Sequence, residues 1–282
     1  MLNDGWTEDE LKDGKIVMKQ YLNKQNILGL INSQLDESIR IFALKRVTNS
    51  FDMKKNTRSR IYEYIIPVRA FHPYKELKED EEKPKITDDE YEKIHTKLMK
   101  IIKKFEGTHD FHNYTLAKKA DSHGTQRFIK SMSLEKLDRG ILEKMYPEKK
   151  DTIEDYFKIT LHGQSFIYHQ IRKMVGMAVQ LFQEDMDLFV MDNAFLKNKF
   201  PIWLAPSEGL LLDRLTFEGY NMRSDIPESL EFEESELAAL TEFKHRVIYK
   251  EVIDSQEERG VFDEWLKQHF RDLPVSENDS DK

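Results

Sequence analysis

Cysteine is absent from this 282-residue chain, which excludes disulfide bonds, thiolate catalysis, iron–sulfur clusters and cysteine-based zinc sites. Long hydrophobic runs are also missing: none approaches the roughly 18 apolar residues that a membrane-spanning helix needs. The N-terminal sequence Met-Leu-Asn-Asp-Gly-Trp is too acidic and too interrupted for a signal or transit peptide. We therefore expect a soluble intracellular protein with no membrane partner.

Charge is distributed unevenly along the chain. The formal net charge is −8, but residues 225–282 alone hold 17 acidic and 7 basic residues. Residues 1–224 then hold 35 acidic and 37 basic residues, a small positive excess. Because the acidity is concentrated at one end, the overall net charge does not exclude a polyanionic partner for the rest of the chain.

Hydrophobic spacing predicts a mixture of helices and strands. Aromatic residues make up 11% of the chain, which is typical of a folded protein with a sizeable core. Residues 107–114 are predicted to form a polar-aromatic loop. Connections of varied length favour an α+β fold with antiparallel pairing. The predicted helices are 24–35, 87–105, 166–182, 228–250 and 256–270, and the predicted strands are 16–18, 39–47, 60–67, 153–161 and 210–217.

Seven basic residues and one acidic residue, Asp52, lie between positions 40 and 60. Such a band is a plausible surface for binding phosphates, and the alternative is an ordinary solvated face. The seven are Arg40, Lys45, Arg46, Lys54, Lys55, Arg58 and Arg60.

The strand predicted at 60–67 contains Arg60, Tyr62 and Tyr64 at alternate positions. Alternation places the two tyrosines on one face of the strand, with the arginine beside them. An aromatic ring next to a cation can stack on a nucleobase that has left its helix. The alternative is a tyrosine pair in the core of a sheet.

Histidines in the segment His109-Asp110-Phe111-His112 suggest a metal site. No fourth ligand is evident, however, and loop histidines more often form hydrogen bonds. We expect no metal, and favour a packed loop that supports a neighbouring site.

Arg172 falls within the mostly apolar helix predicted at 166–182, together with His169. A largely buried arginine would need a carboxylate partner, because an unpaired buried charge is very costly. The alternative is a surface arginine on the flank of the helix.

Several segments together resemble the TruA-type tRNA pseudouridine synthases, and most closely the eukaryotic pseudouridine synthase 1 branch. The resemblance extends from about residue 15 to residue 273. Each motif is weak alone, but five in the same order are a specific signal. They are Ile31–Ile41, Phe51–Tyr64, Phe105–Thr115, Gly163–Gly176 and Ala205–Leu212, followed by a similar end at Phe243–Leu266.

The resemblance implies isomerisation of uridine to pseudouridine in RNA without a cofactor. It implies an antiparallel sheet flanked by helices, with an RNA-binding cleft between two halves. Tyr62 corresponds to the tyrosine that packs against the flipped uracil, and Arg172 to the basic residue that pairs with the catalytic aspartate. A guanidinium keeps such a carboxylate ionised and oriented as a nucleophile. The predicted substrate-binding residues are Arg60, Tyr64, His109, Phe111, His169, Lys54, Lys55 and Arg58.

The family's nucleophilic aspartate lies in an Arg-Thr-Asp-x-Gly-Val type of motif, which is not found here. The corresponding region reads Asp4-Gly5-Trp6-Thr7-Glu8-Asp9. We expect a chain shortened at its N-terminus, and the alternative is a catalytically inactive RNA-binding relative. Neither Asp4 nor Asp9 is assigned as the nucleophile.

The resemblance also predicts the organisation and the partners of the chain. Residues 1–58 would be the remnant of an N-terminal half, 59–223 the catalytic half and 224–282 an acidic helical extension. We expect a monomer that acts on tRNA, with other RNAs as further candidates. The predicted location is the nucleus, with the mitochondrion and cytoplasm as alternatives.

Overall fold

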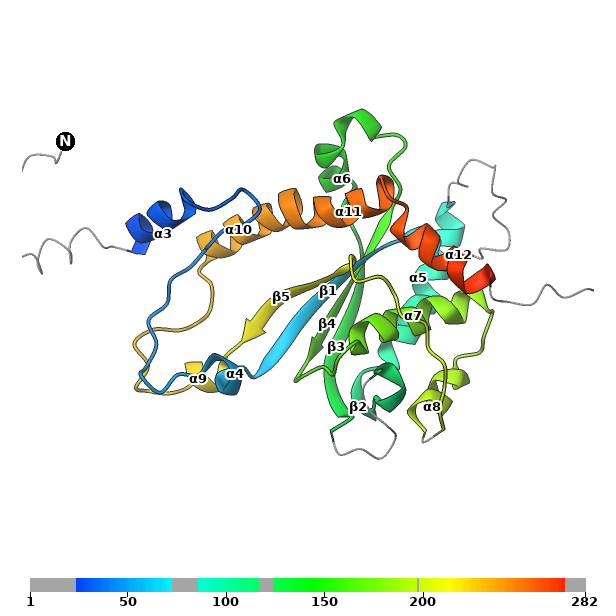
Figure 1. The fold of residues 1–282 in the computed structure, drawn as a ribbon, viewed down its shortest axis with the longest axis horizontal. Helices are drawn as coiled ribbons and strands as arrows, with labels where there is room; N and C mark the ends of the chain where they lie inside the picture. The colour runs from blue at the N-terminus through cyan, green and yellow to red at the C-terminus, as the bar shows by residue number, and fades with distance from the viewer. Residues whose placement is uncertain (1–23, 73–85, 117–123, 197, 272–282) are drawn as a thin grey trace, which may run out of the picture.

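An antiparallel five-stranded sheet forms the centre of the molecule in the computed structural model, which describes residues 24–72, 86–116, 124–196 and 198–271. The strand order is β2-β3-β4-β1-β5, so strands far apart in the sequence lie side by side (Figure 1). The α+β fold with an antiparallel sheet flanked by helices is therefore confirmed. The strands are β1 (Ser59–Pro67), β2 (Gly107–Asp110), β3 (Gln126–Lys136), β4 (Tyr156–Gly163) and β5 (Leu210–Thr216).

Helices of three to sixteen residues surround the sheet. None in the described part of the chain is long and apolar enough to cross a membrane. The α-helices are α3 (Lys24–Asn32), α4 (Met53–Asn56), α5 (Asp88–Lys103), α6 (Arg139–Met145), α7 (Gln170–Gln183), α8 (Phe189–Phe195), α9 (Glu218–Asn221), α10 (Glu234–Phe243), α11 (Lys250–Glu257) and α12 (Val261–Arg271). Shorter 3-10 turns are Val68–Phe71, His112–Tyr114 and Pro147–Lys149, and Lys244–Tyr249 is a π-helical segment between α10 and α11.

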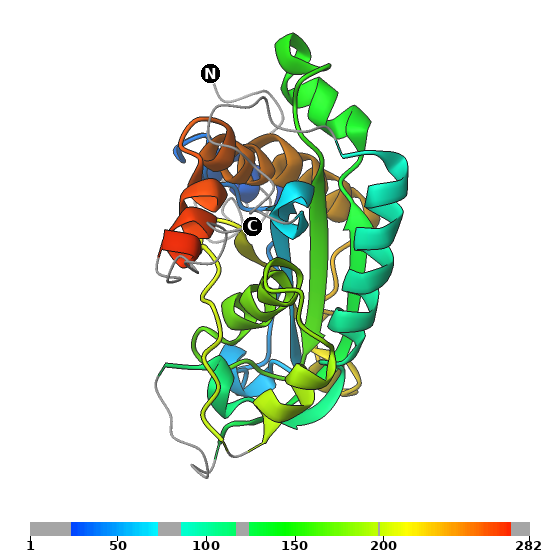
Figure 2. The same ribbon diagram turned by 90° about the vertical axis from the view of Figure 1, so that its right-hand side faces the viewer.

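The larger hydrophobic core joins one face of the sheet to α5 and α7. Tyr64 and Ile66 of β1 contribute to this core, as do Leu98 of α5 and Met177 of α7. Helix α5 begins at a capping box in which Thr87 and Glu90 bond each other's backbone. Figure 2 shows this helix running alongside the sheet.

Helix α5 also covers part of the open edge of β3. Strand β2 pairs only with the first part of β3, up to Ile129. Beyond that point the Glu106 carboxylate accepts from the Met132 N–H at 2.7 Å, and Lys103 donates to the Met132 carbonyl at 2.8 Å. Side chains from the end of α5 thus replace a neighbouring strand at this residue, which protects the edge from pairing with another chain.

The opposite face of β1 packs against the C-terminal helices. Ile65 forms a second core with Tyr249, Ile253 and other buried residues. Glu63, only 5% exposed, accepts from Tyr249 at 2.7 Å and from Lys244 at 2.8 Å. Lys244 also pairs with Asp213 of β5. The acidic C-terminal segment is therefore bonded to the sheet through a buried polar network.

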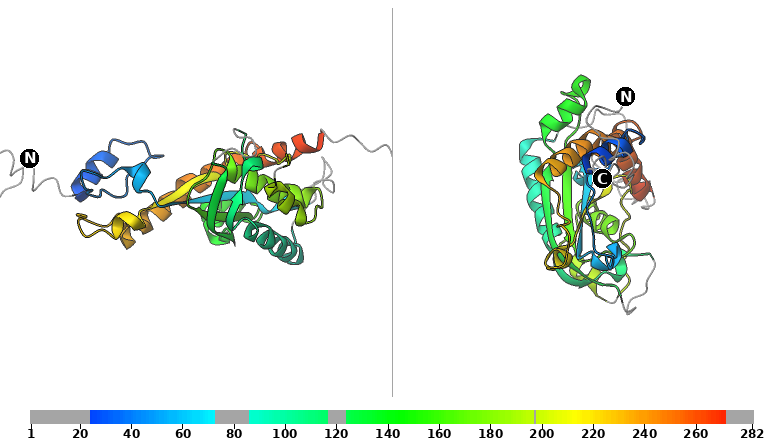
Figure 3. Two further views of the ribbon diagram at one scale, coloured as in Figure 1. Left: turned by 90° about the horizontal axis from the view of Figure 1, so that it is seen from below. Right: turned by 90° about the vertical axis from the view of Figure 1, so that its left-hand side faces the viewer.

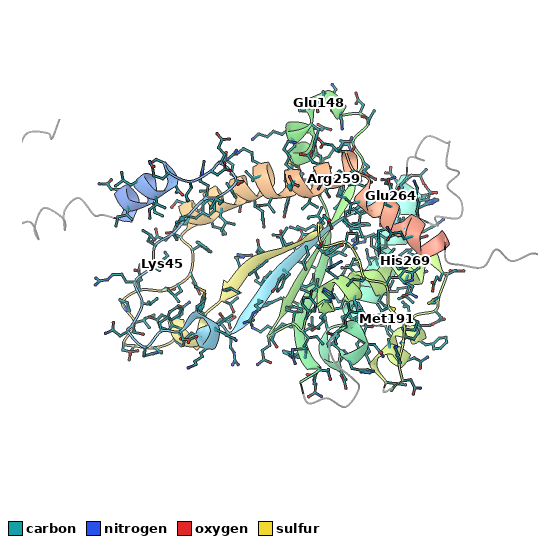
Figure 4. The ribbon with its side chains drawn as sticks, in the orientation of Figure 1. Lys45, Glu148, Met191, Arg259, Glu264 and His269 are labelled. Carbon is teal, nitrogen blue, oxygen red and sulfur yellow. The ribbon has the colours of Figure 1, made fainter. Side chains whose placement is uncertain are left out.

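The strand predicted at 39–47 is wrong, because this segment has no regular secondary structure and does not belong to the sheet. Its neighbours are a helix and side chains: Asn32 bonds both backbone groups of Ile41, Phe42 packs edge-on against Phe243, and Lys45 pairs with Glu236. Alternation of residue types suggested a strand, but a β-strand also requires a backbone partner. Lys45 and α10 lie side by side in Figure 4.

The other predicted elements compare closely with the structure. The strands at 60–67, 153–161 and 210–217 and the helices at 24–35, 87–105, 166–182, 228–250 and 256–270 are confirmed, with some shifts at their ends. The loop predicted at 107–114 contains β2, and β3 was not predicted. Figure 3 shows α3 and α12 at opposite ends of the molecule. The strand predicted at 16–18 lies outside the described residues, and the three-part domain division remains a prediction.

Candidate active site and RNA interface

Tyr62 and Tyr64 lie on one face of β1, as alternation predicted, but their environments differ. Tyr64 is fully buried, and its hydroxyl donates to the Pro206 carbonyl at 2.6 Å. Tyr62 is partly exposed, and its ring meets Phe166 edge-to-face with centroids 5.2 Å apart. The prediction that Tyr64 contacts substrate is corrected, because a ring without exposed surface offers nothing to a nucleotide. Tyr62 retains an accessible surface.

Arg172 lies in the first turn of α7 and is partly exposed. Its Nε donates to the Ala205 carbonyl at 2.6 Å. No described carboxylate forms an ion pair with it. Burial raises the pKa of Tyr64, and the positive charge of Arg172 partly opposes that increase. Arg172 and Tyr64 donate to the carbonyls of two consecutive residues, Ala205 and Pro206. Among the described residues, the partner of Arg172 is therefore a backbone carbonyl, and its pairing with a carboxylate stays a prediction.

The segment that carries Ala205 approaches α7 very closely at Gly176. A Cβ added at Gly176 would lie 2.0 Å from the Trp203 carbonyl oxygen, far inside van der Waals contact. Only glycine fits at this position without displacing the backbone. Further along the segment, a Cβ at Gly209 would lie 2.5 Å from the Ile65 carbonyl oxygen. These close approaches hold the segment between α7 and β1, next to Arg172 and Tyr64.

His169 precedes α7 in a left-handed backbone conformation, with φ of 67°. This conformation costs a non-glycine residue about 1–3 kcal/mol and is often found at functional sites. It also ends the turn at 168–169, so α7 begins at Gln170 rather than at the predicted Phe166. Burial lowers the pKa of His169, and the positive charges of Arg172 and Lys173 lower it further. Its imidazole is consequently neutral at neutral pH.

Four of the seven predicted basic residues line one cavity of about 440 Å³ between α4, β1 and α9. Lys54, Lys55 and Arg58 are exposed, and Arg60 donates to the Gln164 carbonyl at 3.1 Å. No acidic side chain lines this cavity; the other lining residues are Asn56, Thr57, Gln164, Ser165, Gly219 and Tyr220. The cavity thus has the positive charge and the hydrogen-bond donors that a phosphate group requires.

Two other members of the basic band have different roles. Arg40 donates to the carbonyls of Asp36 and Ile39, both at 2.6 Å. Lys45 pairs with Glu236 at 3.0 Å, and its neighbour Glu233 lies at 3.7 Å. The band is therefore not a single surface: one end holds the N-terminal segment in place and the other lines the cavity.

The loop with two histidines is packed into the core. Phe111 is fully buried, so its predicted contact with substrate is corrected. The His109 ring stacks on Phe195 with centroids 4.3 Å apart and bonds the Glu106 carbonyl at 2.9 Å. Asp110 lies 3.4 Å from the His112 ring. No group of three or more potential metal ligands occurs among the described residues.

Asn113 connects this loop to the N-terminal part of α7. Its carbonyl accepts from the Lys173 ammonium at 3.0 Å, while its side chain bonds the backbone of Ala194, Asn198 and Phe200. Lys173 is only 7% exposed, and burial lowers its pKa. The loop therefore supports the turn of α7 that carries Arg172, as the packed-loop prediction proposed for a neighbouring site.

Comparison with known families provides the decisive observation. The family model described as tRNA pseudouridine synthase matches residues 101–218. This segment belongs to the tRNA pseudouridine synthase family. The match includes the motifs at 105–115, 163–176 and 205–212, and Arg172 within them. The resemblance inferred from those motifs is confirmed.

Longer similarities extend the relationship to most of the chain. It is 30% identical over 256 residues to the mouse protein "Pseudouridylate synthase 1 homolog" and 31% identical over 258 residues to the human one. Each alignment covers 90% of this chain and 56% of the relative. The Candida albicans "tRNA pseudouridine synthase 1" is 26% identical over 336 residues. The chain thus spans about half the length of these pseudouridine synthases.

Two features of this site were missed by sequence reasoning. The first is the contact of Arg172 with Ala205, which joins residues 33 positions apart. The segment 205–212 was identified only as a family motif, and its Pro and Gly residues indicated a loop without indicating where that loop packs. The second is the exposed Tyr168, which immediately precedes His169, a predicted substrate-binding residue.

Proposed function

We propose that this chain acts as an RNA pseudouridine synthase, with a uridine of tRNA as its substrate. The described residues would supply the side of the site that binds the uridine and the RNA backbone. In this proposal Tyr62 contacts the face of the uracil, Arg172 holds a carboxylate beside the ribose, and the cavity with Lys54 and Lys55 binds phosphate. Isomerisation breaks the bond from ribose C1′ to N1 and forms a bond from C1′ to C5. C5 loses its proton to solvent and N1 takes up a proton, so the formula is unchanged.

The position of Arg172 is the observation that carries this proposal. Its Nε donates to the Ala205 carbonyl, and the next carbonyl, that of Pro206, accepts from Tyr64, two residues after Tyr62 on the same face of β1. A guanidinium fixed through one nitrogen still has its terminal nitrogens to offer to a planar carboxylate. Such a pairing lowers a carboxylate's pKa and keeps the group ionised as a nucleophile.

The carboxylate itself is not assigned. Asp4 and Asp9 lie outside the described residues, and none of the described carboxylates pairs with Arg172. Most of the rate in such a reaction depends on how firmly the nucleophile is oriented. We therefore expect the 282-residue chain to bind tRNA but to form little or no pseudouridine by itself.

Two measurements test this proposal together. The first is the affinity of the chain for unmodified tRNA, measured over a range of salt concentrations. The second is tritium release from tRNA labelled at uridine C5, with the substitutions Asp4→Ala and Asp9→Ala made in parallel. Binding without tritium release is the expected result. Efficient release would support the function but contradict the expected inactivity, and its loss in one aspartate variant would identify the nucleophile.

Absence of specific tRNA binding would overturn the proposal. A tRNA from which every uridine has been replaced by pseudouridine serves as the matched control ligand, since it preserves the backbone charge. Tritium release by the parent chain that is unaffected by Arg172→Ala would also contradict the role given to this arginine. Nuclear location and a monomeric state stay part of the proposal, to be tested by imaging of the tagged protein and by sedimentation.

A further inference from the structure

Tyr168 presents an aromatic ring to solvent at the entrance to α7. Its side chain is 69% exposed, although tyrosine rings in folded proteins usually bury most of their apolar surface. The ring stacks on His169, with centroids 3.7 Å apart and planes inclined by 27°. Because so much of the ring is exposed, His169 covers one face and leaves the other open.

His169 supports this arrangement through its backbone and its charge state. Its left-handed conformation is one of two such cases among the described non-glycine residues. Its lowered pKa keeps the imidazole neutral, and a neutral ring can stack on tyrosine without the cost of desolvating a cation. Its Nδ1 is buried without a hydrogen-bond partner in the described chain. Both the strained backbone of His169 and its unbonded ring nitrogen raise the free energy of the folded chain, and the stacked pair persists despite them.

The stacked pair lies next to the site described above. Two residues before Tyr168, Phe166 packs against Tyr62. Arg172, three residues after His169, donates to the Ala205 carbonyl. Gln164 and Ser165, which precede Phe166, line the basic cavity. One short segment, 164–172, therefore connects the phosphate-binding cavity, the uracil-binding ring and the arginine, with the exposed Tyr168 between them.

We propose that Tyr168 is a stacking platform for an RNA base next to the target uridine. This inference rests on the proposed function and adds a second nucleotide position to it. A uridine can reach Tyr62 only if it leaves the base stack, which removes one stacking partner from its neighbour. The open face of Tyr168 replaces that partner. Stacking needs no base-specific hydrogen bond, so the position accepts any base but favours purines, which stack more strongly.

The substitution Tyr168→Ala should weaken tRNA binding about five- to a hundred-fold, the range that loss of one base–aromatic stack produces. The slope of affinity against salt should stay unchanged, since no phosphate contact is removed. Tyr168→Phe should bind as the parent does, and Tyr168→Leu should resemble Tyr168→Ala because leucine has no π-face. Phe189→Ala is the matched control: this ring is 60% exposed on α8, outside the segment 164–172.

A fluorescent base gives a direct reading of stacking. RNA hairpins with 2-aminopurine on the 5′ or the 3′ side of a single loop uridine should show quenching on binding at one of the two positions. Tyr168→Ala should abolish that quenching at saturating protein, when reduced affinity no longer matters. Quenching that persists in Tyr168→Ala, or equal weakening by Phe189→Ala, would overturn the inference.

The outcomes also separate this inference from the proposed function. If the parent protein and Tyr168→Ala bind tRNA equally well, only the stacking role of Tyr168 is contradicted. Parent protein that does not bind RNA at all contradicts both. A salt slope that becomes flatter in Tyr168→Ala would show that the residue acts by positioning phosphate contacts, and this too would overturn a stacking role.

Discussion

Arg172 and Ala205 bond each other twice. The guanidinium Nε donates to the Ala205 carbonyl at 2.6 Å, and the Ala205 N–H donates to the Arg172 carbonyl at 3.2 Å. The first turn of α7 and the segment before β5 are thus fixed in register at this residue. An arginine held in this way has few accessible rotamers, and its charge is preorganised before any ligand arrives.

Arg172→Lys tests how much this pairing depends on the guanidinium. Lysine keeps the charge but has no Nε in a fixed plane, so the bond to Ala205 should be lost. We expect the free energy of unfolding to fall by about 1.5–3 kcal/mol, the contribution of a hydrogen bond from a charged group, as measured by urea denaturation. Affinity for tRNA should change less than twofold. An unchanged urea midpoint would mean that the bond contributes nothing.

The basic cavity predicts a specific change in salt dependence. Replacing Lys54, Lys55 and Arg58 together by alanine should weaken tRNA binding and reduce the slope of log affinity against log salt by about 2 to 3. The measurement is a filter-binding titration at several salt concentrations. Alanine at Lys93, Lys100 and Lys144 provides a control with the same loss of charge, since none of these lines the cavity. Equal slopes for both triple variants would reject a dedicated phosphate site.

The lowered pKa values of three histidines lead us to expect that the free energy of unfolding falls at acid pH. Burial lowers the pKa values of His162, His169 and His245, and neighbouring cations contribute in each case. Between these lowered values and the unfolded value of about 6.5, the unfolded chain binds more protons than the folded chain. Stability should therefore decrease as the pH falls through about 6.5, as followed by urea unfolding from pH 8 to pH 5.5. The double variant His162→Gln and His245→Gln should show a weaker dependence; an identical pH profile would exclude these histidines as its source.

A single methyl group added at Gly176 should strongly destabilise the fold. Gly176→Ala places a Cβ against the Trp203 carbonyl, so α7 and the segment 202–209 must separate. We expect a loss of about 3 kcal/mol in the free energy of unfolding. Gly29→Ala is the matched control, because nothing lies within 4 Å of its added Cβ in the exposed helix α3. It should stabilise by about 0.5–1 kcal/mol, and similar effects of the two substitutions would contradict the close approach.

Local patterns predicted the elements that depend on local forces. The capping box at Thr87 and the strand ending at Pro67 follow from side-chain chemistry within a few residues. The strand predicted at 39–47 was wrong because a strand forms only where another strand lies beside it. The neighbour of this segment is helix α10. Strand β3 was missed although its buried residues Met132 and Leu134 alternate with exposed serine and glutamate. That alternation was available in the sequence.

The candidate site was predictable in composition rather than in detail. Family motifs identified Tyr62 and Arg172, and charge counting identified Lys54, Lys55 and Arg58. Alternation alone could not show that Tyr64 is buried and Tyr62 partly exposed, because both occupy the same face of one strand and their surroundings come from distant segments. No sequence pattern revealed Tyr168, because an exposed tyrosine just before a helix looks the same in the sequence as a buried one.

Strand β1 packs on α5 and α7 with one face and on the C-terminal helices with the other, and this restricts how its sequence can vary during evolution. Tyr62 faces the proposed uridine site, whereas the next residue, Glu63, faces Lys244 and Tyr249 in the C-terminal helices. Inserting or deleting one residue between Ser59 and Pro67 would exchange the two sets, burying the carboxylate in the hydrophobic core and moving the tyrosine to the wrong layer. Length changes should therefore be confined to the connections at either end of this strand, while the strand itself changes only by substitution.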